Sequence, residues 1–265
     1  PVAVRLLDNL LDTSHFPLAA QRTEARATRR IGLGFMGLGS ALNMLGLHYD
    51  SPAARNLAAG IARTLRDSAY QASIDLARAR GAFPALERTA YLASPFVARL
   101  PPALRAEIGR YGIRNSHLLA IAPTGTISLL ANNVSSGIEP VFRNAYTRTL
   151  RTGTESSSMP VEDYALLCWR EAFGGAPAPE RFVTAATLPP SAHLLMQAAV
   201  QPMVDQGISK TINVPADIQR GAFRQIYLDA HRLRLKGITT FRPRPDRPGV
   251  LRENTVPAAP PARGS

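Results

Sequence analysis

Apolar residues recur at helical spacing near the N-terminus. Val4, Leu7 and Leu11 share one face and predict a helix over residues 2–11. A second, more polar helix is predicted over residues 20–28. The glycine-rich apolar run at 30–37 then predicts a tightly packed strand that enters a helix.

The longest predicted helix runs from Pro52 to Arg80. Its face is marked by apolar residues at positions 57, 61, 65, 69, 72 and 76. Ser51 is a candidate N-cap, Pro52 suits the first helical position, and Gly81 suits the residue after the helix. Both ends of this helix therefore carry local signals.

Short apolar runs predict strands between the helices. The run at 117–122 is continuous and of strand length, as in strands buried on both faces. Other strands are predicted over 140–150, 210–214 and 238–242, and helices over 102–112, 161–173, 190–204 and 217–236. The alternation predicts an α/β fold with a largely parallel sheet or barrel.

The last residues differ in kind from the rest. Prolines at 243, 245, 248, 257, 260 and 261 stand among few apolar residues. Such a segment is typical of an unstructured tail or linker. We therefore predict one domain over residues 1–242 and a Pro-rich disordered tail over 243–265.

Composition narrows the class of protein. With 265 residues, 45% of them hydrophobic, the chain can bury a sizeable core. No apolar run approaches about 18 uncharged residues and the N-terminus shows no signal-peptide pattern, so we expect a cytoplasmic protein without a membrane partner. The net charge is +12, but 29 of the 31 basic residues are arginines spread along the chain. With 6% aromatic residues, this pattern disfavours nucleic-acid binding.

Cysteine and histidine usage excludes several kinds of site. Cys168 is the single cysteine, which rules out an internal disulfide and a dithiol couple. We expect it to be a buried apolar thiol on a helix. The five histidines form no ligand pair, so no metal site is predicted.

A strand, a tight turn and a Thr/Ser-rich segment follow one another over 121–130. If a helix begins near Thr126, its free N–H groups face outward at the end of the strand. Gly125 lets a ligand approach the backbone, and the hydroxyls of Thr124, Thr126 and Ser128 can donate to anionic oxygens. The pattern fits a phosphate site without lysine, but the pattern alone favours a simple Ser/Thr-rich helix cap.

The glycines at 32, 34 and 37 match the dinucleotide fingerprint, with Asp50 downstream. A nicotinamide-dependent dehydrogenase would need a buried strand just before them, and residues 23–30 are polar and charged. Close packing of a helix on a strand explains these glycines better.

Several segments together resemble a known family, the class II, vitamin B12-dependent ribonucleotide reductases. The similar segments are RRIGLGFMG (29–37), RNSH (114–117), PTGTIS (123–128), SGIEPVF (136–142), ISKTINVP (208–215) and KGITTFRP (236–243). Their order and spacing also fit that family. The resemblance covers nearly the whole chain up to Pro243.

The resemblance implies the C-terminal part of a ten-stranded α/β barrel. In that family the PTGTIS loop binds the substrate's phosphates, which assigns this role to Thr124, Gly125, Thr126, Ile127 and Ser128. The implied substrate is a ribonucleoside di- or triphosphate. The implied partner is the N-terminal part of the barrel or a complementary chain.

The resemblance also indicates the radical source. Relatives that take their radical from a second subunit carry a tyrosine pair where this chain has Thr239 and Thr240. Adenosylcobalamin bound at the site is the consistent alternative. In the family a cobalamin-derived radical oxidises a cysteine, which abstracts the ribose 3′-hydrogen before the 2′-position is reduced.

The family's radical cysteine lies in an Asn-x-Cys-x-Glu segment upstream of the part represented here, and Cys168 matches neither it nor its partner cysteine. We therefore expect no catalytic residue in this chain and no turnover by the chain alone. The alternative interpretation is a non-catalytic truncated or split-barrel fragment that binds nucleotide phosphate or a complementary chain.

Overall fold

The computed structural model describes residues 1–152, 155–243 and 251–252. Most of the tail predicted at 243–265 lies outside these residues, and its disorder stays a prediction. Leu251–Arg252 form β5, which pairs antiparallel with β1 (Ala145–Thr152). In the described part of the chain, no helix combines the length and the apolar character needed to cross a membrane.

Extended segments from distant parts of the sequence lie side by side and parallel. Leu33 pairs with Leu119, and Ile121 pairs with Ile208. Further along the same segment, β3 (Thr211–Asn213) pairs in parallel with β4 (Thr239–Phe241). These segments form a parallel array, which we call the strand array, in the order 31–33, 117–121, 206–213 and 239–241.

The strand array confirms the predicted parallel α/β character. A closed barrel is not formed by the residues that the structure describes, which are mainly helical. The strand predicted over 117–122 is present only as two isolated bridges, because its neighbours pair with it over short stretches.

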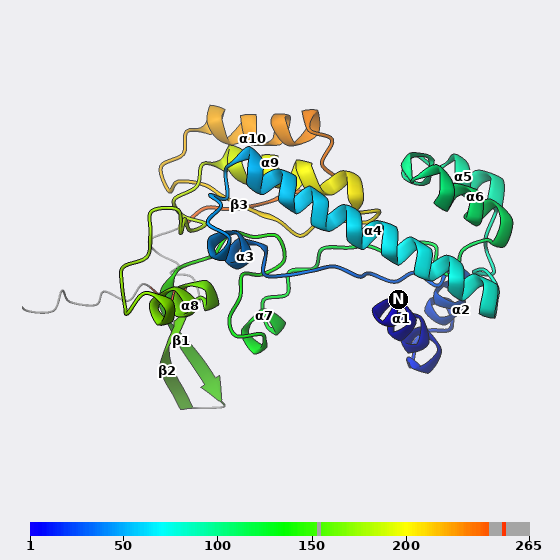
Figure 1. Cartoon of the computed structure of the whole chain (residues 1–265), viewed down its shortest axis with the longest axis horizontal. Coiled ribbons are helices and arrows are strands. Elements are labelled where there is room, and N and C mark those ends of the chain that lie inside the picture. The colour runs from blue at the N-terminus through cyan, green and yellow to red at the C-terminus, as the bar shows by residue number, and fades with distance from the viewer. Residues whose placement is uncertain (153–154, 244–250, 253–265) are drawn as a thin grey trace, which may run out of the picture.

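Helix α4 (Pro52–Arg80) crosses the molecule and packs along α9 (Pro190–Val200), with α10 (Arg220–Arg232) beyond α9 (Figure 1). Its predicted ends are confirmed. The Ser51 hydroxyl accepts a hydrogen bond from the Ala54 N–H, and Gly81 follows the last turn. Ala54, Ala58 and Ala62 recur every four residues on its buried face and are at most 2% exposed. Small side chains there let neighbouring elements approach closely.

The N-terminal helices α1 (Val2–Thr13) and α2 (Ala19–Thr28) are joined to the strand array by a buried carboxylate. Asp8 is fully buried, and its Oδ1 lies 2.8 Å from Arg29 Nε. The Asn115 side chain also donates to Asp8 Oδ1, at 3.0 Å. Asp8 therefore links α1 to the residues just before each of the first two extended segments.

The remaining helices are short. They are α3 (Leu38–Met44), α5 (Arg88–Ala93), α6 (Pro102–Tyr111), α7 (Ile127–Leu130) and α8 (Tyr164–Ala172), with 3-10 turns η1 (Val97–Arg99) and η2 (Gln201–Met203). Helix α5 was not predicted from the sequence. Helices α6, α8, α9 and α10 lie within the predicted ranges and are shorter than predicted, whereas α1 and α2 are slightly longer. For α3 the sequence predicted a helix after the glycine-rich run but no range.

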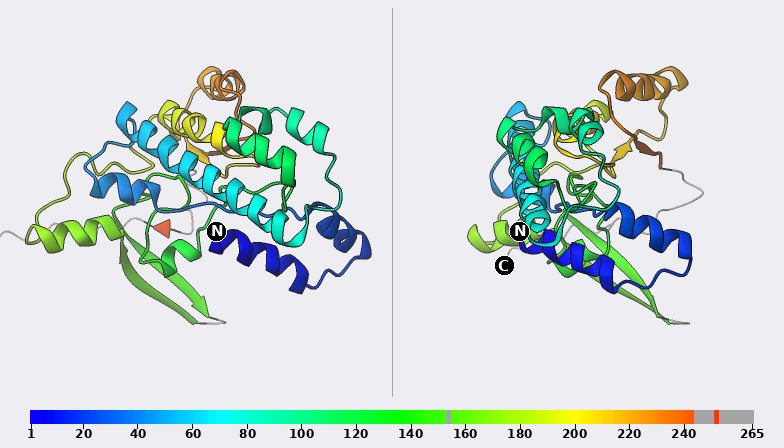
Figure 2. Two further views of the ribbon diagram at one scale, coloured as in Figure 1. Left: turned by 45° about the vertical axis from the view of Figure 1, so that its right-hand side comes forward. Right: turned by 90° about the vertical axis from the view of Figure 1, so that its right-hand side faces the viewer.

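An antiparallel hairpin of β1 and β2 (Glu155–Glu162) replaces the single strand predicted over 140–150. Tyr146 lies opposite Val161 in its register. The hairpin extends away from the helices (Figure 2). The helix predicted from Val161 begins instead at Tyr164, because the Asp163 side chain accepts the Ala165 N–H as its N-cap.

Glycine at position 34 is required by the spacing of the strand array. A Cβ on Gly34 would lie 2.2 Å from the Ala120 carbonyl oxygen, which is a severe clash with backbone. A Cβ on Gly32 would lie 3.3 Å from the Ala120 Cβ. Both glycines therefore serve close packing between two extended segments, whereas the sequence indicated close packing of a helix on a strand.

Substitution of Gly34 tests this close approach. We expect Gly34→Ala to lower the free energy of unfolding by about 3 kcal/mol, because backbone must move to relieve the clash. The matched control is Gly60→Ala in α4, where a Cβ meets nothing within 4 Å. That change should raise stability by about 0.5–1 kcal/mol. Urea unfolding monitored by circular dichroism measures the free energy of unfolding of both variants. Equal changes in the two would contradict the close backbone approach at Gly34.

Candidate functional site

The candidate phosphate loop, residues 123–128, follows directly on the extended segment 117–121. A helix was predicted to begin near Thr126, and α7 begins at Ile127. This helix is a single turn of four residues. The loop therefore lies at the carboxyl end of a strand, where the backbone changes from extended to helical.

The backbone amides of Gly125, Thr126 and Ile127 form the exposed part of the loop. All three residues are exposed, and within the described residues none of their N–H groups has a hydrogen-bond acceptor. The Ser128 N–H differs, because it donates to the Thr124 carbonyl at 2.9 Å. Three of the predicted donor amides are thus available, and that of Ser128 is used by the fold.

The side chains of Thr124 and Ser128 are partly used to fix the loop. Thr124 Oγ1 accepts the Gly137 N–H at 2.9 Å, so its own hydroxyl proton can still be donated. Ser128 is buried, and its Oγ lies 3.2 Å from Ser136 Oγ. Thr124 adopts φ of 52°, a left-handed conformation that is uncommon for threonine.

Gly125 leaves open space at the loop. A Cβ built there meets nothing within 4 Å, so the protein itself does not require a glycine for packing. The loop borders a cavity of about 400 Å³, whose wall also includes Ser135, Ser136 and Asp163. The absence of a steric neighbour agrees with a place where a ligand approaches the backbone.

The segment 134–139 supports the loop from behind. Gly137 and Ser136 hold Thr124 and Ser128 by the contacts described above, and the Tyr49 hydroxyl donates to the Ile138 carbonyl at 2.6 Å. A Cβ on Gly39 of α3 would lie 2.7 Å from the Glu139 carbonyl oxygen, so α3 packs directly against this segment.

A buried ion pair joins segment 134–139 to the strand array. Lys210 Nζ lies 2.5 Å from Glu139 Oε2, and the Thr211 N–H donates to Glu139 Oε1 at 2.6 Å. Both carboxylate oxygens are therefore bound at the start of β3. Lys210 is 1% exposed and also contacts His193 Nδ1 at 2.8 Å. We call Glu139, Lys210 and His193 the anchor cluster.

Burial sets the protonation of these groups. It lowers the pKa of Lys210, although the Glu139 carboxylate opposes the shift. Burial, together with the Lys210 charge, lowers the pKa of His193 to about 3. At the edge of the cavity, burial raises the pKa of Asp163, and hydrogen bonds from Ser40 and Ala165 partly offset it.

The sequence interpretation did not include the anchor cluster. Its members come from a loop, from α9 and from the residue before β3, and 71 residues separate Glu139 from Lys210. One signal was available, because Lys210 is one of only two lysines in a chain with 29 arginines. A lysine beside an apolar strand in such a chain indicates a specific partner side chain.

The surroundings of the glycines at 32, 34 and 37 bear on the dinucleotide-binding alternative. Helix α2, not a strand, precedes Gly32, so the context of a dinucleotide site is missing.

Cys168 was expected to be buried, and this expectation was wrong in degree. Cys168 is partly exposed and lies with Trp169 and Phe173 at a cavity of about 390 Å³. No group of three metal-ligating residues occurs among the described residues.

Comparisons with known proteins support the resemblance found in the sequence. Residues 1–241 match the family model described as "Ribonucleotide reductase, barrel domain". The chain is 39% identical over 259 residues to the vitamin B12-dependent ribonucleoside-diphosphate reductase of Mycobacterium tuberculosis strain H37Rv, covering 91% of this chain and 34% of that protein.

Two further relatives extend the comparison. The protein of the same name from Thermoplasma acidophilum is 32% identical over 274 residues, covering 96% of this chain and 33% of that protein. The ribonucleoside-diphosphate reductase large chain of Encephalitozoon cuniculi is 33% identical over 158 residues, covering 56% of this chain and 20% of that protein. The chain spans about a third of the length of the two B12-dependent relatives.

Removing the charge of Glu139 or of Lys210 should lower the free energy of unfolding by different amounts. Glu139→Gln leaves the buried Lys210 without a counter-charge and should cost about 3 kcal/mol or more of unfolding free energy. Lys210→Met should cost less, about 1 to 2 kcal/mol, because the Glu139 side chain is 21% exposed and keeps the Thr211 N–H. The double variant should be more stable than the two losses added together. If urea unfolding shows that the loss in the double variant equals the sum of the two single losses, Glu139 and Lys210 do not interact.

His193 predicts an acid-sensitive stability. The unfolded chain binds a proton at this histidine below pH 6.5, whereas the folded protein binds it only near pH 3. Stability is therefore present above pH 6.5 and is lost as the pH falls toward 3, at roughly 1 kcal/mol per pH unit. His193→Gln should flatten this slope by that amount. Unfolding measured from pH 7 to 4 in both proteins tests it, and parallel curves would refute the role of His193.

Proposed function

Because this chain belongs to the ribonucleotide reductase barrel-domain family, we propose that it supplies the substrate-phosphate loop of a vitamin B12-dependent reductase. The whole enzyme would convert ribonucleotides to 2′-deoxyribonucleotides by a thiyl radical mechanism. The names of the two B12-dependent relatives favour ribonucleoside diphosphates as substrates. In this proposal the radical cysteine belongs to a part of the enzyme other than this chain.

The observation that carries the proposal is the set of three available amides at Gly125, Thr126 and Ile127. Consecutive N–H groups at the start of a helical turn are suited to phosphate oxygens. The Thr124 hydroxyl can add a further donor, and Ser128 fixes the loop from its buried side. Backbone amides and hydroxyls of this kind bind phosphate without a lysine.

Binding of the phosphates would position the rest of the nucleotide. Contacts to groups that do not react can orient the ribose against the radical site, and orientation of this kind lowers barriers by up to about 7–11 kcal/mol. The anchor cluster contributes indirectly, because it fixes segment 134–139 and through it Thr124 and Ser128. Glu139 and Lys210 are thus positioning residues for the loop.

Adenosylcobalamin is the proposed cofactor of the whole enzyme. The names of the relatives support it, as do Thr239 and Thr240 in place of a tyrosine pair. The Tyr227 hydroxyl lies 3.1 Å from Thr240 Oγ1, so one phenol from α10 does reach this strand. When bound, the cofactor supplies a carbon-centred radical. The described residues hold no metal-ligating cluster, and we assign none of them to the cobalt.

The strand array is proposed to be completed by the rest of a ten-stranded barrel. Its outer segments, 31–33 and β4, each pair on one side only among the described residues. Unpaired strand edges favour pairing with further strands. The partner would be the N-terminal part of the barrel or a complementary chain, and we expect no turnover from this chain alone.

Substitution at Gly125 tests the phosphate loop. In the whole enzyme, Gly125→Val should abolish nucleotide binding, because its side chain would occupy open space at the three amides, where a Cβ meets no protein atom within 4 Å. Equilibrium dialysis with a ribonucleoside diphosphate measures the affinity, and circular dichroism checks the fold.

The control for this variant is Gly221→Val at the start of α10, where a Cβ also meets nothing within 4 Å. It should bind nucleotide like the parent enzyme. Undiminished affinity in the folded Gly125→Val enzyme would refute the assignment of the loop.

A further inference from the structure

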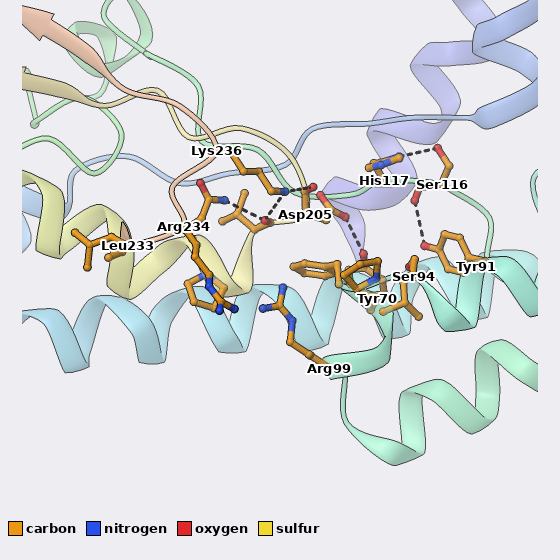
Figure 3. Close-up of a pocket in the computed structure, with 17 residues that line it drawn as sticks. Tyr70, Tyr91, Ser94, Arg99, Ser116, His117, Asp205, Leu233, Arg234 and Lys236 are labelled. Atoms are coloured by element: carbon orange, nitrogen blue, oxygen red, sulfur yellow. Dashed lines mark hydrogen bonds between the residues drawn. The ribbon is translucent and has the colours of Figure 1, made fainter. Parts of the chain in front are cut away.

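A second cavity, of about 460 Å³, lies at the opposite end of the extended segments from the phosphate loop. Ser116 and His117, at the start of the segment 117–121, form part of its wall, whereas residues 123–128 follow the end of that segment. Other parts of the wall come from α4, the segment 91–99, η2 and the residues after α10 (Figure 3). We call it the entry pocket.

Three cationic side chains border the entry pocket: Arg99, Arg234 and Lys236. Figure 3 shows the guanidinium groups of Arg99 and Arg234 directed toward one another. Within the part of the chain that the structure describes, neither side chain forms an ion pair or donates a hydrogen bond; Arg99 has only the Phe96 ring, 6.0 Å away. Both side chains are exposed, and two like charges that face one another favour an anion between them.

The one carboxylate among the residues that line the entry pocket already accepts three hydrogen bonds from the protein. Asp205 Oδ2 accepts the Leu118 N–H and the Tyr70 hydroxyl, each at 2.8 Å, and Oδ1 accepts the Leu119 N–H at 2.9 Å. Lys236 Nζ donates to the Asp205 backbone carbonyl at 2.5 Å rather than to its carboxylate. Three cations facing one carboxylate leave an excess of two positive charges.

A buried acceptor in the wall lacks its donor. Gln201 is 7% exposed, and its Nε2 donates to the Val204 and Gln206 carbonyls. Its Oε1 is buried and has no partner among the described residues. An unpaired buried acceptor costs free energy, so a ligand that brings an N–H or O–H donor is favoured there.

Much of the rest of the wall is apolar, and Phe96, packed on the buried Tyr70, supplies its aromatic surface. The rings of Tyr70 and Phe96 are stacked, with centroids 5.9 Å apart and planes at 28°. Pro95, Val97 and Pro202 continue this surface. A flat apolar body suits such a wall, as in pockets that combine aromatic surface with a few directed polar groups.

We propose that the entry pocket binds a small organic phosphate with a flat ring and a hydrogen-bond donor. The phosphate lies between Arg99 and Arg234 near Lys236, the ring lies against Phe96 and Pro202, and the donor is directed to the side of the pocket where Gln201 Oε1 lacks a partner. The excess of two positive charges matches a phosphate dianion better than a carboxylate. This site is separate from the phosphate loop and does not depend on its role.

Three probes separate these contributions: 4-aminophenyl phosphate, phenyl phosphate and inorganic phosphate. Calorimetric titration uses the whole protein carrying Gly125→Val, so that the phosphate loop does not contribute. We expect phenyl phosphate to bind, the amine to tighten binding about fivefold, and inorganic phosphate to bind more weakly than both. Equal affinities for the three probes, or no binding of the aminophenyl ester, would overturn the proposal.

Matched variants locate the binding. Arg99→Gln with Arg234→Gln should weaken 4-aminophenyl phosphate about 30-fold or more, because two charge-assisted contacts are lost. Arg105→Gln with Arg224→Gln removes two exposed arginines elsewhere and should change nothing. Unfolding curves confirm that both proteins fold. If the first pair binds as tightly as the second, the phosphate lies elsewhere and the proposal is wrong.

Discussion

The ion pair between Glu139 and Lys210 is the interaction on which the candidate site depends. A lysine ammonium with almost no contact with solvent requires a counter-charge, and the carboxylate that supplies it belongs to the segment behind the phosphate loop. Because Thr211 holds the second carboxylate oxygen, the segment has one position relative to β3. From there, hydrogen bonds continue to Thr124 and Ser128. A charge in the strand array thus determines where the loop lies.

Close backbone packing limits the same region sterically. Gly34 admits the Ala120 carbonyl into the strand array, and Gly39 admits the backbone at Glu139 against α3. Neither contact leaves room for a methyl group. At Glu139, polar contacts and close packing therefore act on the same short stretch of backbone, and a shift in one would disturb the other.

Local signals were enough to predict the elements whose ends are encoded nearby. Ser51, Pro52 and Gly81 delimit α4 by capping and backbone conformation, and these effects depend only on adjacent residues. The hairpin of β1 and β2 was missed because the stretch at 155–158, Glu followed by three serines, lacks the alternation that marks a strand. The exposed amides of the loop followed from the strand and turn pattern, but the use of the Ser128 N–H depends on how α7 closes. Contacts between distant residues, such as Glu139 with Lys210 or Asp8 with Asn115, require the folded chain.

The left-handed backbone at Thr124 has a consequence for ligand affinity. A threonine there is costly unless its surroundings hold it, and the Gly137 N–H on its hydroxyl does so. The folded protein therefore selects a single loop conformation before any anion arrives. Binding of an anion would therefore cost little conformational entropy of the loop. More of the free energy of its contacts with the three amides would then appear as binding affinity.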